Sequence, residues 1–189
     1  MGEEVDKQAK KGRTVRLMFQ DEARFGRISD ARRCWVPADI RPVVGCQLVR
    51  EYTYAYAAVS PHDGIMDSLV LPEVNASLMS LFLDEVARRH NDEFIFMVMD
   101  GAAWHNAEDL KIPENMRIQV LPPYCAEINP SEHIWEEMRE KDFANQVFDS
   151  MDAVEDQLVY SLARLEIAPD TVASITGFHW IVNIPLNAT

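Results

Sequence analysis

Short runs of apolar residues recur along the chain at lengths typical of buried β-strands. The runs RLMF at 16–19 and FIFMVM at 94–99 lack the spacing of an amphipathic helix. Polar, glycine-containing or proline-containing segments flank them, as expected for strands. We therefore predict strands over 14–20, 43–50, 52–59, 65–71, 94–99 and 117–121.

Helical spacing of apolar residues first appears after residue 74. Asn75 is an effective N-cap, and the apolar side chains that follow recur at helical intervals. The expected buried face of this helix consists of Leu78, Leu81, Phe82 and Val86.

Further helices are predicted in the second half of the chain. Asn129 is expected to cap a helix whose first residue is Pro130, a position that proline favours. A final long helix is expected over the apolar stripe from Met151 to Leu165, and a short helix over 107–111.

The order of these elements predicts an α/β fold in which antiparallel leading strands precede alternating strands and helices. At 189 residues and 48% hydrophobic composition, the chain can bury one sizeable core. We expect residues 1–13 to form a disordered polar leader and residues 14–189 to form a single domain without internal repeats.

Three acidic residues occupy positions where such a fold gathers chemistry. Asp21 and Asp100 each follow an apolar run, so they should emerge at the carboxyl ends of strands, where α/β sheets bind ligands. Glu132 follows the helix start at Asn129. Three converging carboxylates suit Mg²⁺ or Mn²⁺, and two such ions suit phosphodiester cleavage.

Each of these acids also has a purely structural interpretation. Asp21 and Asp100 are also residues that often occupy turns. Glu22 competes with Asp21 for the role of metal ligand, and only one of the two can face the ions, because adjacent strand residues point to opposite faces. Glu132 is suited to a capping box with Asn129. The pattern of residues by itself leaves these alternatives open.

The segments around the three acids are more distinctive than the acids themselves. They are DE followed by RFGR at 21–27, D-x-x-x-x-H at 100–105, and LPPY-x-x-x-x-NP-x-E-x-x-W at 121–135. Together they resemble the catalytic domain of DDE transposases, and most closely the mariner-like superfamily of bacterial insertion sequences. The similarity extends roughly from Thr14 to Met138.

This resemblance implies a ribonuclease H-like fold in which Asp21, Asp100 and Glu132 are the first, second and third acids of a triad that holds two Mg²⁺ or Mn²⁺ ions. The implied function is divalent-metal-dependent cleavage of DNA strands and strand transfer during transposition. Two alternative functions are a ribonuclease H-like nuclease without transposition, and a catalytically degenerate remnant that only binds DNA or a partner protein.

Two features depart from the family pattern. Only 31 residues separate Asp100 from Glu132, against the mid-thirties usual in the superfamily, and Gly101 replaces a common asparagine. The resemblance also implies helix-turn-helix modules ahead of the catalytic domain, and the first expected strand near Thr14 leaves no room for one. We therefore expect that region to be missing from this chain, and a homodimer to act in a synaptic complex.

Charge is distributed unevenly along the chain. The net charge is −13, but residues 10–50 carry +6 and the remainder carries −19. A basic segment beside the first acid suits contacts with DNA phosphates, although a solvated charged surface explains the same pattern. The candidate DNA-binding side chains are Arg24, Arg27, Arg32, Arg33 and His105.

The number of cysteines and the hydropathy of the chain limit the cellular compartments in which the protein is expected. Three cysteines without paired spacing favour a reduced compartment over a disulfide framework or a zinc site. No apolar stretch reaches the length of a membrane span, and the N-terminus lacks the apolar core of a signal peptide. We therefore expect a cytoplasmic protein, and the resemblance to transposases of bacterial insertion sequences implies a bacterial protein associated with the nucleoid.

Overall fold

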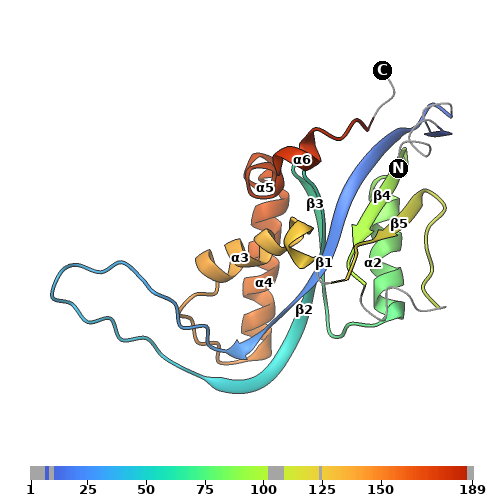
Figure 1. Ribbon diagram of the computed structural model, residues 1–189. Coiled ribbons are helices and arrows are strands. Elements are labelled where there is room, and N and C mark those ends of the chain that lie inside the picture. The colour runs from blue at the N-terminus through green and yellow to red at the C-terminus, as the bar shows by residue number, and fades with distance from the viewer. Residues whose placement is uncertain (1–6, 9–10, 102–108, 124, 187–189) are drawn as a thin grey trace.

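The computed structural model describes residues 7–8, 11–101, 109–123 and 125–186. Its centre is a five-stranded sheet in the order β3-β2-β1-β4-β5 (Figure 1). β2 is antiparallel to both β1 and β3, whereas β4 is parallel to both β1 and β5. The strands are β1 (Thr14–Ile28), β2 (Leu48–Ser60), β3 (Ile65–Leu71), β4 (Glu93–Met99) and β5 (Met116–Val120).

The leader expected at 1–13 falls mostly outside the described residues. Within it, Gln8 is buried, and its carbonyl oxygen accepts hydrogen bonds from the backbone N–H groups of Lys11 and Arg13. This part of the segment therefore packs against the body, and for the residues outside the described ranges the leader stays a prediction.

β1 is 15 residues long, about twice the length of the strand predicted at 14–20. The alternation of buried side chains continues through Ala23 and Phe25, and β2 pairs with β1 along this extension. Asp21 thus lies within β1, so the prediction that it ends the strand was wrong. The apolar run stops at residue 19, but pairing with β2 satisfies the backbone beyond it.

Gly26 marks a close approach between β1 and β2. It lies opposite Tyr52, and the register shifts between Gly26 and Ile28. A Cβ atom at this position would collide with the carbonyl oxygen of Glu51 and with the Tyr52 ring. The glycine of the RFGR segment is therefore required by packing.

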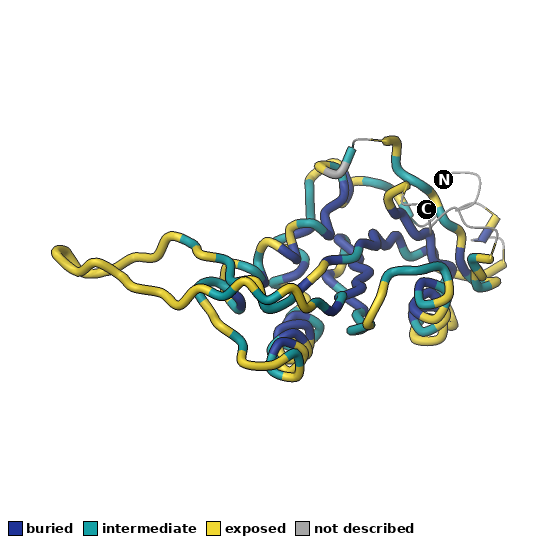
Figure 2. The backbone as a smooth tube through the Cα atoms, turned by 90° about the horizontal axis from the view of Figure 1, so that it is seen from below, coloured by how far each residue is buried: buried dark blue, intermediate teal, exposed yellow. Residues whose placement is uncertain are grey.

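β2 is one continuous strand where two had been predicted, over 43–50 and 52–59. We call residues 29–47, which join β1 to β2, the arm. The arm extends away from the body, and most of its residues are exposed (Figures 1 and 2). The connection between the first two strands, expected at 21–42 from their predicted bounds, is thus shifted toward the C-terminus, because 21–28 continue β1.

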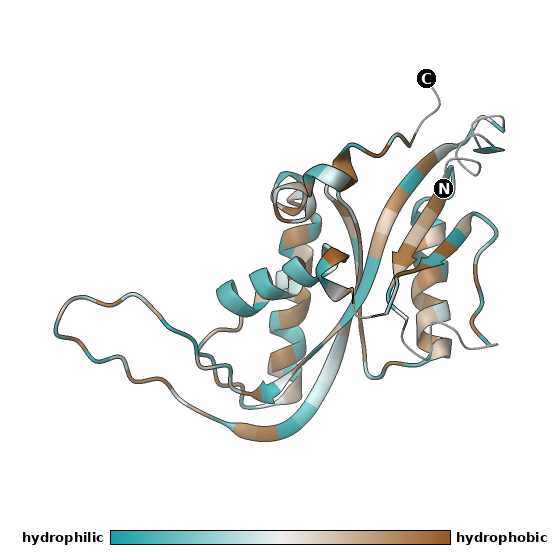
Figure 3. Ribbon diagram, viewed as in Figure 1, coloured by the Kyte–Doolittle hydropathy of each residue, from teal (hydrophilic) through white to brown (hydrophobic). Residues whose placement is uncertain are grey.

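Helices cover both faces of the sheet, in keeping with the α/β fold that was predicted. One face carries α2 (Ala76–Arg89), and the other carries α3 (Ser131–Lys141), α4 (Met151–Glu166) and α5 (Pro169–Thr176). Each face buries its own apolar cluster, and Figure 3 shows hydrophobic residues concentrated along β4 and α2. The short elements η2 (Ala126–Ile128) and α6 (His179–Val182) complete the fold.

The predicted start of α2 is confirmed, but its predicted buried face is partly wrong. The Asn75 side chain accepts a hydrogen bond from the backbone N–H of Leu78 at 2.9 Å. Leu81 is 54% exposed, whereas the buried residues are Met79, Phe82, Leu83, Val86 and Ala87. Two apolar stripes overlap on this helix, and packing against the sheet selects the one that contains Met79 and Leu83.

The later helices follow the prediction with small shifts. α3 begins at Ser131, with Pro130 at its N-cap rather than at its first position. The apolar stripe of α4 is buried at Val154, Leu158, Leu162 and Leu165. Residues 109–111 are not helical, and the rest of the short helix predicted at 107–111 lies outside the described residues. No described helix is long and apolar enough to cross a membrane.

Candidate active site

The parallel pairing of β1 with β4 sets the first two acids at the same level of the sheet. The register pairs Phe19 with Val98, and the pairing ends there. Asp21 lies two residues beyond that pair along β1, and Asp100 lies two residues beyond it, directly after β4. The register therefore places both residues at the end of the sheet where the pairing of β1 with β4 stops.

Asp21 is a buried carboxylate with a defined hydrogen-bond donor. It is 8% exposed, and the indole Nε1–H of Trp135 donates to its Oδ2 at 2.8 Å. Burial and the nearby charge of Glu132 raise the pKa of Asp21 to about 7, while the bond from Trp135 acts in the opposite direction. Near neutral pH this carboxyl is therefore balanced between its two protonation states.

The first turn of α3 brings Glu132 toward Asp21. The Asn129 side-chain amide donates to the carbonyl oxygen of Gln20 at 3.0 Å, and the Ser131 hydroxyl donates to that of Phe19 at 2.8 Å. These bonds fix the start of α3 to β1, and Glu132 is half-buried beside them. The charge of Glu132 acts on the pKa of Asp21, so the structure brings these two acids together.

Asp100 follows β4 directly and is exposed. Among the residues that the structure describes, no group of three His, Cys, Asp or Glu side chains is close enough to hold a metal ion. The structure thus couples Asp21 with Glu132 and sets Asp100 at the neighbouring strand end. The donor set still fits a hard cation, because a buried carboxylate beside a second acid is stabilised by positive charge.

The arginines proposed to contact DNA have different surroundings. The Arg27 side chain pairs with Glu51 at 2.6 Å and donates to the carbonyl oxygens of Phe148 and Asp149. Arg32 pairs with Asp30 and Glu140. Each of these two arginines therefore also ties the base of the arm to the body.

Two other arginines of this set are exposed. Arg24 lies over the ring of Tyr52, with its guanidinium carbon 4.4 Å from the ring centroid. Arg33 is exposed on the arm. The fifth candidate, His105, lies outside the described residues.

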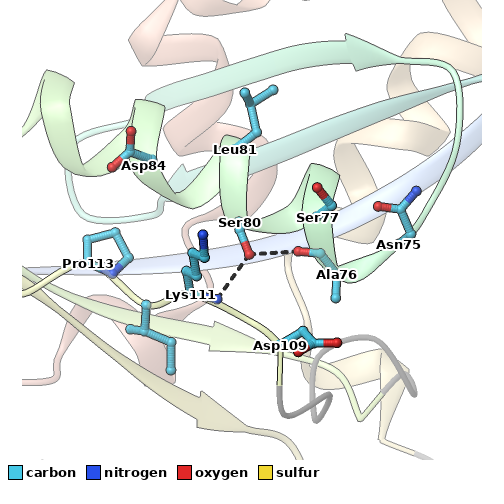
Figure 4. Close-up of a pocket in the computed structure, with 10 residues that line it drawn as sticks. Asn75, Ala76, Ser77, Ser80, Leu81, Asp84, Asp109, Lys111 and Pro113 are labelled. Atoms are coloured by element: carbon cyan, nitrogen blue, oxygen red, sulfur yellow. Dashed lines mark hydrogen bonds between the residues drawn. The ribbon is translucent and has the colours of Figure 1, made fainter.

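The chain also has a cavity of about 910 Å³ beside α2. It is lined by residues from the start of α2 and from the segment before β5, including Ser77, Ser80, Asp84 and Lys111 (Figure 4). α2 covers the face of the sheet opposite to α3, and none of the three candidate acids lines this cavity.

The hydrogen bond between Trp135 and Asp21 was missed by sequence reasoning. Trp135 is 1% exposed and belongs to the apolar cluster between α3 and the sheet. Its spacing of three residues from Glu132 signals that both residues share one side of α3. Nothing in the spacing indicates that the indole reaches a residue 114 positions earlier.

Comparison with known proteins shows the family to which this chain belongs. The family model described as DDE superfamily endonuclease matches residues 16–155, well over half of the chain. The chain therefore belongs to the DDE superfamily endonucleases. A protein of Sinorhizobium fredii (strain NBRC 101917 / NGR234) named "Uncharacterized protein y4pE/y4sA" is 31% identical over 130 residues, which are 68% of this chain and 96% of that protein.

Solved structures of Mos1 transposase share the fold. A pre-cleavage Mos1 transpososome matches with a TM-score of 0.59 and 17% identity, over 94% of this chain and 58% of that one. The Mos1 mariner paired-end complex with Mn matches with a TM-score of 0.54 and 18% identity, over 93% and 60%. This chain thus has a ribonuclease H-like fold. It spans about 60% of the length of the Mos1 chain in the complex with Mn.

Proposed function

We propose that this chain is a transposase catalytic domain that cleaves and joins DNA strands with divalent metal ions. Asp21, Asp100 and Glu132 are its three acids. The observation that carries this proposal is that the start of α3 is bonded to β1 where the pairing of β1 with β4 ends, which supports a shared site for the three carboxylates. The family membership supports the reaction class.

Each acid has a distinct part in the proposed site. Asp21 supplies a carboxylate that is fixed by its burial and by Trp135, and Glu132 supplies one from a helix that is bonded to β1. Asp100 supplies a third carboxylate from the end of β4. The chemistry that bound Mg²⁺ or Mn²⁺ adds is activation of a water or a 3′-hydroxyl and stabilisation of the leaving oxygen.

The proposal is tested by nicking of supercoiled plasmid. We expect conversion to the open-circular form with Mn²⁺ or Mg²⁺, and none when EDTA removes the ions, because the three acids alone offer no nucleophile. Addition of a pre-cleaved element end should also give joined products, which separates a transposase from a simple nuclease. Nicking that is unchanged in EDTA would contradict the proposed metal dependence.

Binding of duplex DNA should be weak and dominated by phosphate contacts. We expect a Kd on the order of 10⁻⁴–10⁻⁶ M or weaker, rising steeply with salt, because the body of the chain is acidic. The double variant Arg24→Ala/Arg33→Ala should weaken binding several-fold for every sequence and reduce the salt dependence. Fluorescence anisotropy with element-end and random duplexes measures both effects.

A matched control for this measurement is Arg88→Ala. Arg88 is exposed on α2 and pairs with Glu85 within the same helix, away from the arm. An equal loss of affinity in Arg88→Ala would show that binding depends on overall charge and not on the proposed residues. Tight, sequence-selective and salt-tolerant binding would contradict the account.

A further inference from the structure

Trp135 and Glu132 come from adjacent turns of α3, and Trp135 reaches the first acid directly. Its indole is buried, and the ring packs edge-on against Phe25 at a centroid distance of 6.2 Å. The Nε1–H points at Oδ2 of Asp21 and donates to it at 2.8 Å. Helix packing therefore sets the direction of this donor.

Three consecutive residues of β1 receive side-chain hydrogen bonds from α3 and the residues just before it. The carbonyl oxygens of Phe19 and Gln20 accept from Ser131 and Asn129, and the carboxylate of Asp21 accepts from Trp135. Pairing of β1 with β4 ends at Phe19, so these donors act where β1 leaves its parallel neighbour. The same helix start carries Glu132, so one rigid unit orients two of the three acids.

We propose that Trp135 is a positioning residue, which holds the Asp21 carboxylate through Oδ2 in the orientation that Asp21 presents to a metal ion. The inference rests on the proposed function, because it assigns the geometry of one ligand in that site. A carboxylate that accepts a hydrogen bond from a fixed donor has a defined orientation. Less conformational free energy is then lost when the carboxylate binds an ion.

A tryptophan that only fills the core would depend on its volume and not on its N–H group. The two roles separate in a pair of variants. Trp135→Phe keeps an aromatic ring but removes the donor, whereas Trp135→His loses ring volume but keeps an N–H in a five-membered ring. A core role predicts that the histidine variant is the more damaged in metal binding, and the positioning role predicts the reverse.

The test is a Mn²⁺ titration of the folded protein without DNA, followed by electron paramagnetic resonance. Trp135→Phe should weaken Mn²⁺ binding by about tenfold or more, as is typical when a group that orients a metal ligand is lost. Trp135→His should stay closer to wild type despite a lower melting temperature. The stability control is Ile134→Ala, a buried change on α3 that should lower the melting temperature and leave Mn²⁺ affinity within about twofold.

Failure of this inference is distinguishable from failure of the proposed function. If wild type binds no Mn²⁺, or if Asp21→Asn binds it equally well, the metal site itself is wrong. If wild type binds Mn²⁺, Asp21→Asn does not, and Trp135→Phe matches wild type, only the role of Trp135 is overturned.

A second measurement applies to the wild-type protein even if a Trp135 variant fails to fold. In NMR spectra of the ¹⁵N-labelled indoles, the Trp135 N–H signal should shift on addition of Mg²⁺, because its acceptor becomes a metal ligand. Trp180 on α6, which is half-exposed, should not shift. A Trp135 signal that is unmoved at saturating Mg²⁺ would overturn the proposal.

Discussion

Asp100→Asn should reduce strand cleavage on the order of 10³-fold while leaving the fold intact. The substitution keeps the size of the side chain but removes the charge that holds a hard cation, and such a site contributes several kcal/mol to the transition state. Asp100 is exposed, so the change replaces no side chain of the apolar core. Plasmid nicking with Mn²⁺ and a thermal melt measure the two effects.

The matched control for this substitution is Asp92→Asn. Asp92 is exposed in the turn that precedes β4, at the opposite end of the same strand. The Asp92→Asn variant loses the same charge as Asp100→Asn but outside the proposed site. Its cleavage rate should therefore stay within about twofold of wild type. Equal cleavage by Asp100→Asn and wild type would show that the activity lies elsewhere.

Asp21→Asn should stabilise the metal-free protein at alkaline pH. Burial and the charge of Glu132 raise the pKa of Asp21 to about 7 in the folded state, against 3.8 as its ordinary value. The folded state therefore holds a proton that the unfolded chain releases, so stability falls as pH rises from about 4 to about 7 and is lowest above that. The difference corresponds to at most on the order of 4 kcal/mol.

Thermal melts between pH 5 and pH 9 check this expectation. Wild type should lose stability across that range relative to Asp21→Asn, whose side chain carries no proton to lose and still accepts from Trp135. Addition of Mn²⁺ at pH 8 should raise the melting temperature of wild type and not that of Asp21→Asn. Parallel pH profiles for the two proteins would contradict the raised pKa.

Much of the fold was predictable because local pattern and tertiary packing agree there. β3 and β4 match the predicted strands closely, since β4 is an apolar run between polar residues and β3 lies between the turn at 61–64 and Pro72. The Asn75 cap is a local interaction that a single residue type specifies. Asp100 directly follows β4 for the same local reason.

The remaining differences arise from long-range pairing, which no local pattern encodes. Asp21 lies within β1 because β2 continues to pair with it beyond the apolar run. The side chain of Asn129 bonds to the backbone of Gln20 in β1, and α3 begins at Ser131 and not at Pro130. Arg27 is tied to the residues before α4, a contact 121 positions away in sequence.

The central claim is that Asp21, Asp100 and Glu132 together hold divalent metal ions. Anomalous diffraction from crystals soaked in Mn²⁺, collected at the manganese absorption edge, tests it most directly. The account predicts anomalous density between these three carboxylates in wild type and its loss in Asp100→Asn. Density at another cluster, or none at a Mn²⁺ concentration that supports plasmid nicking, would contradict it.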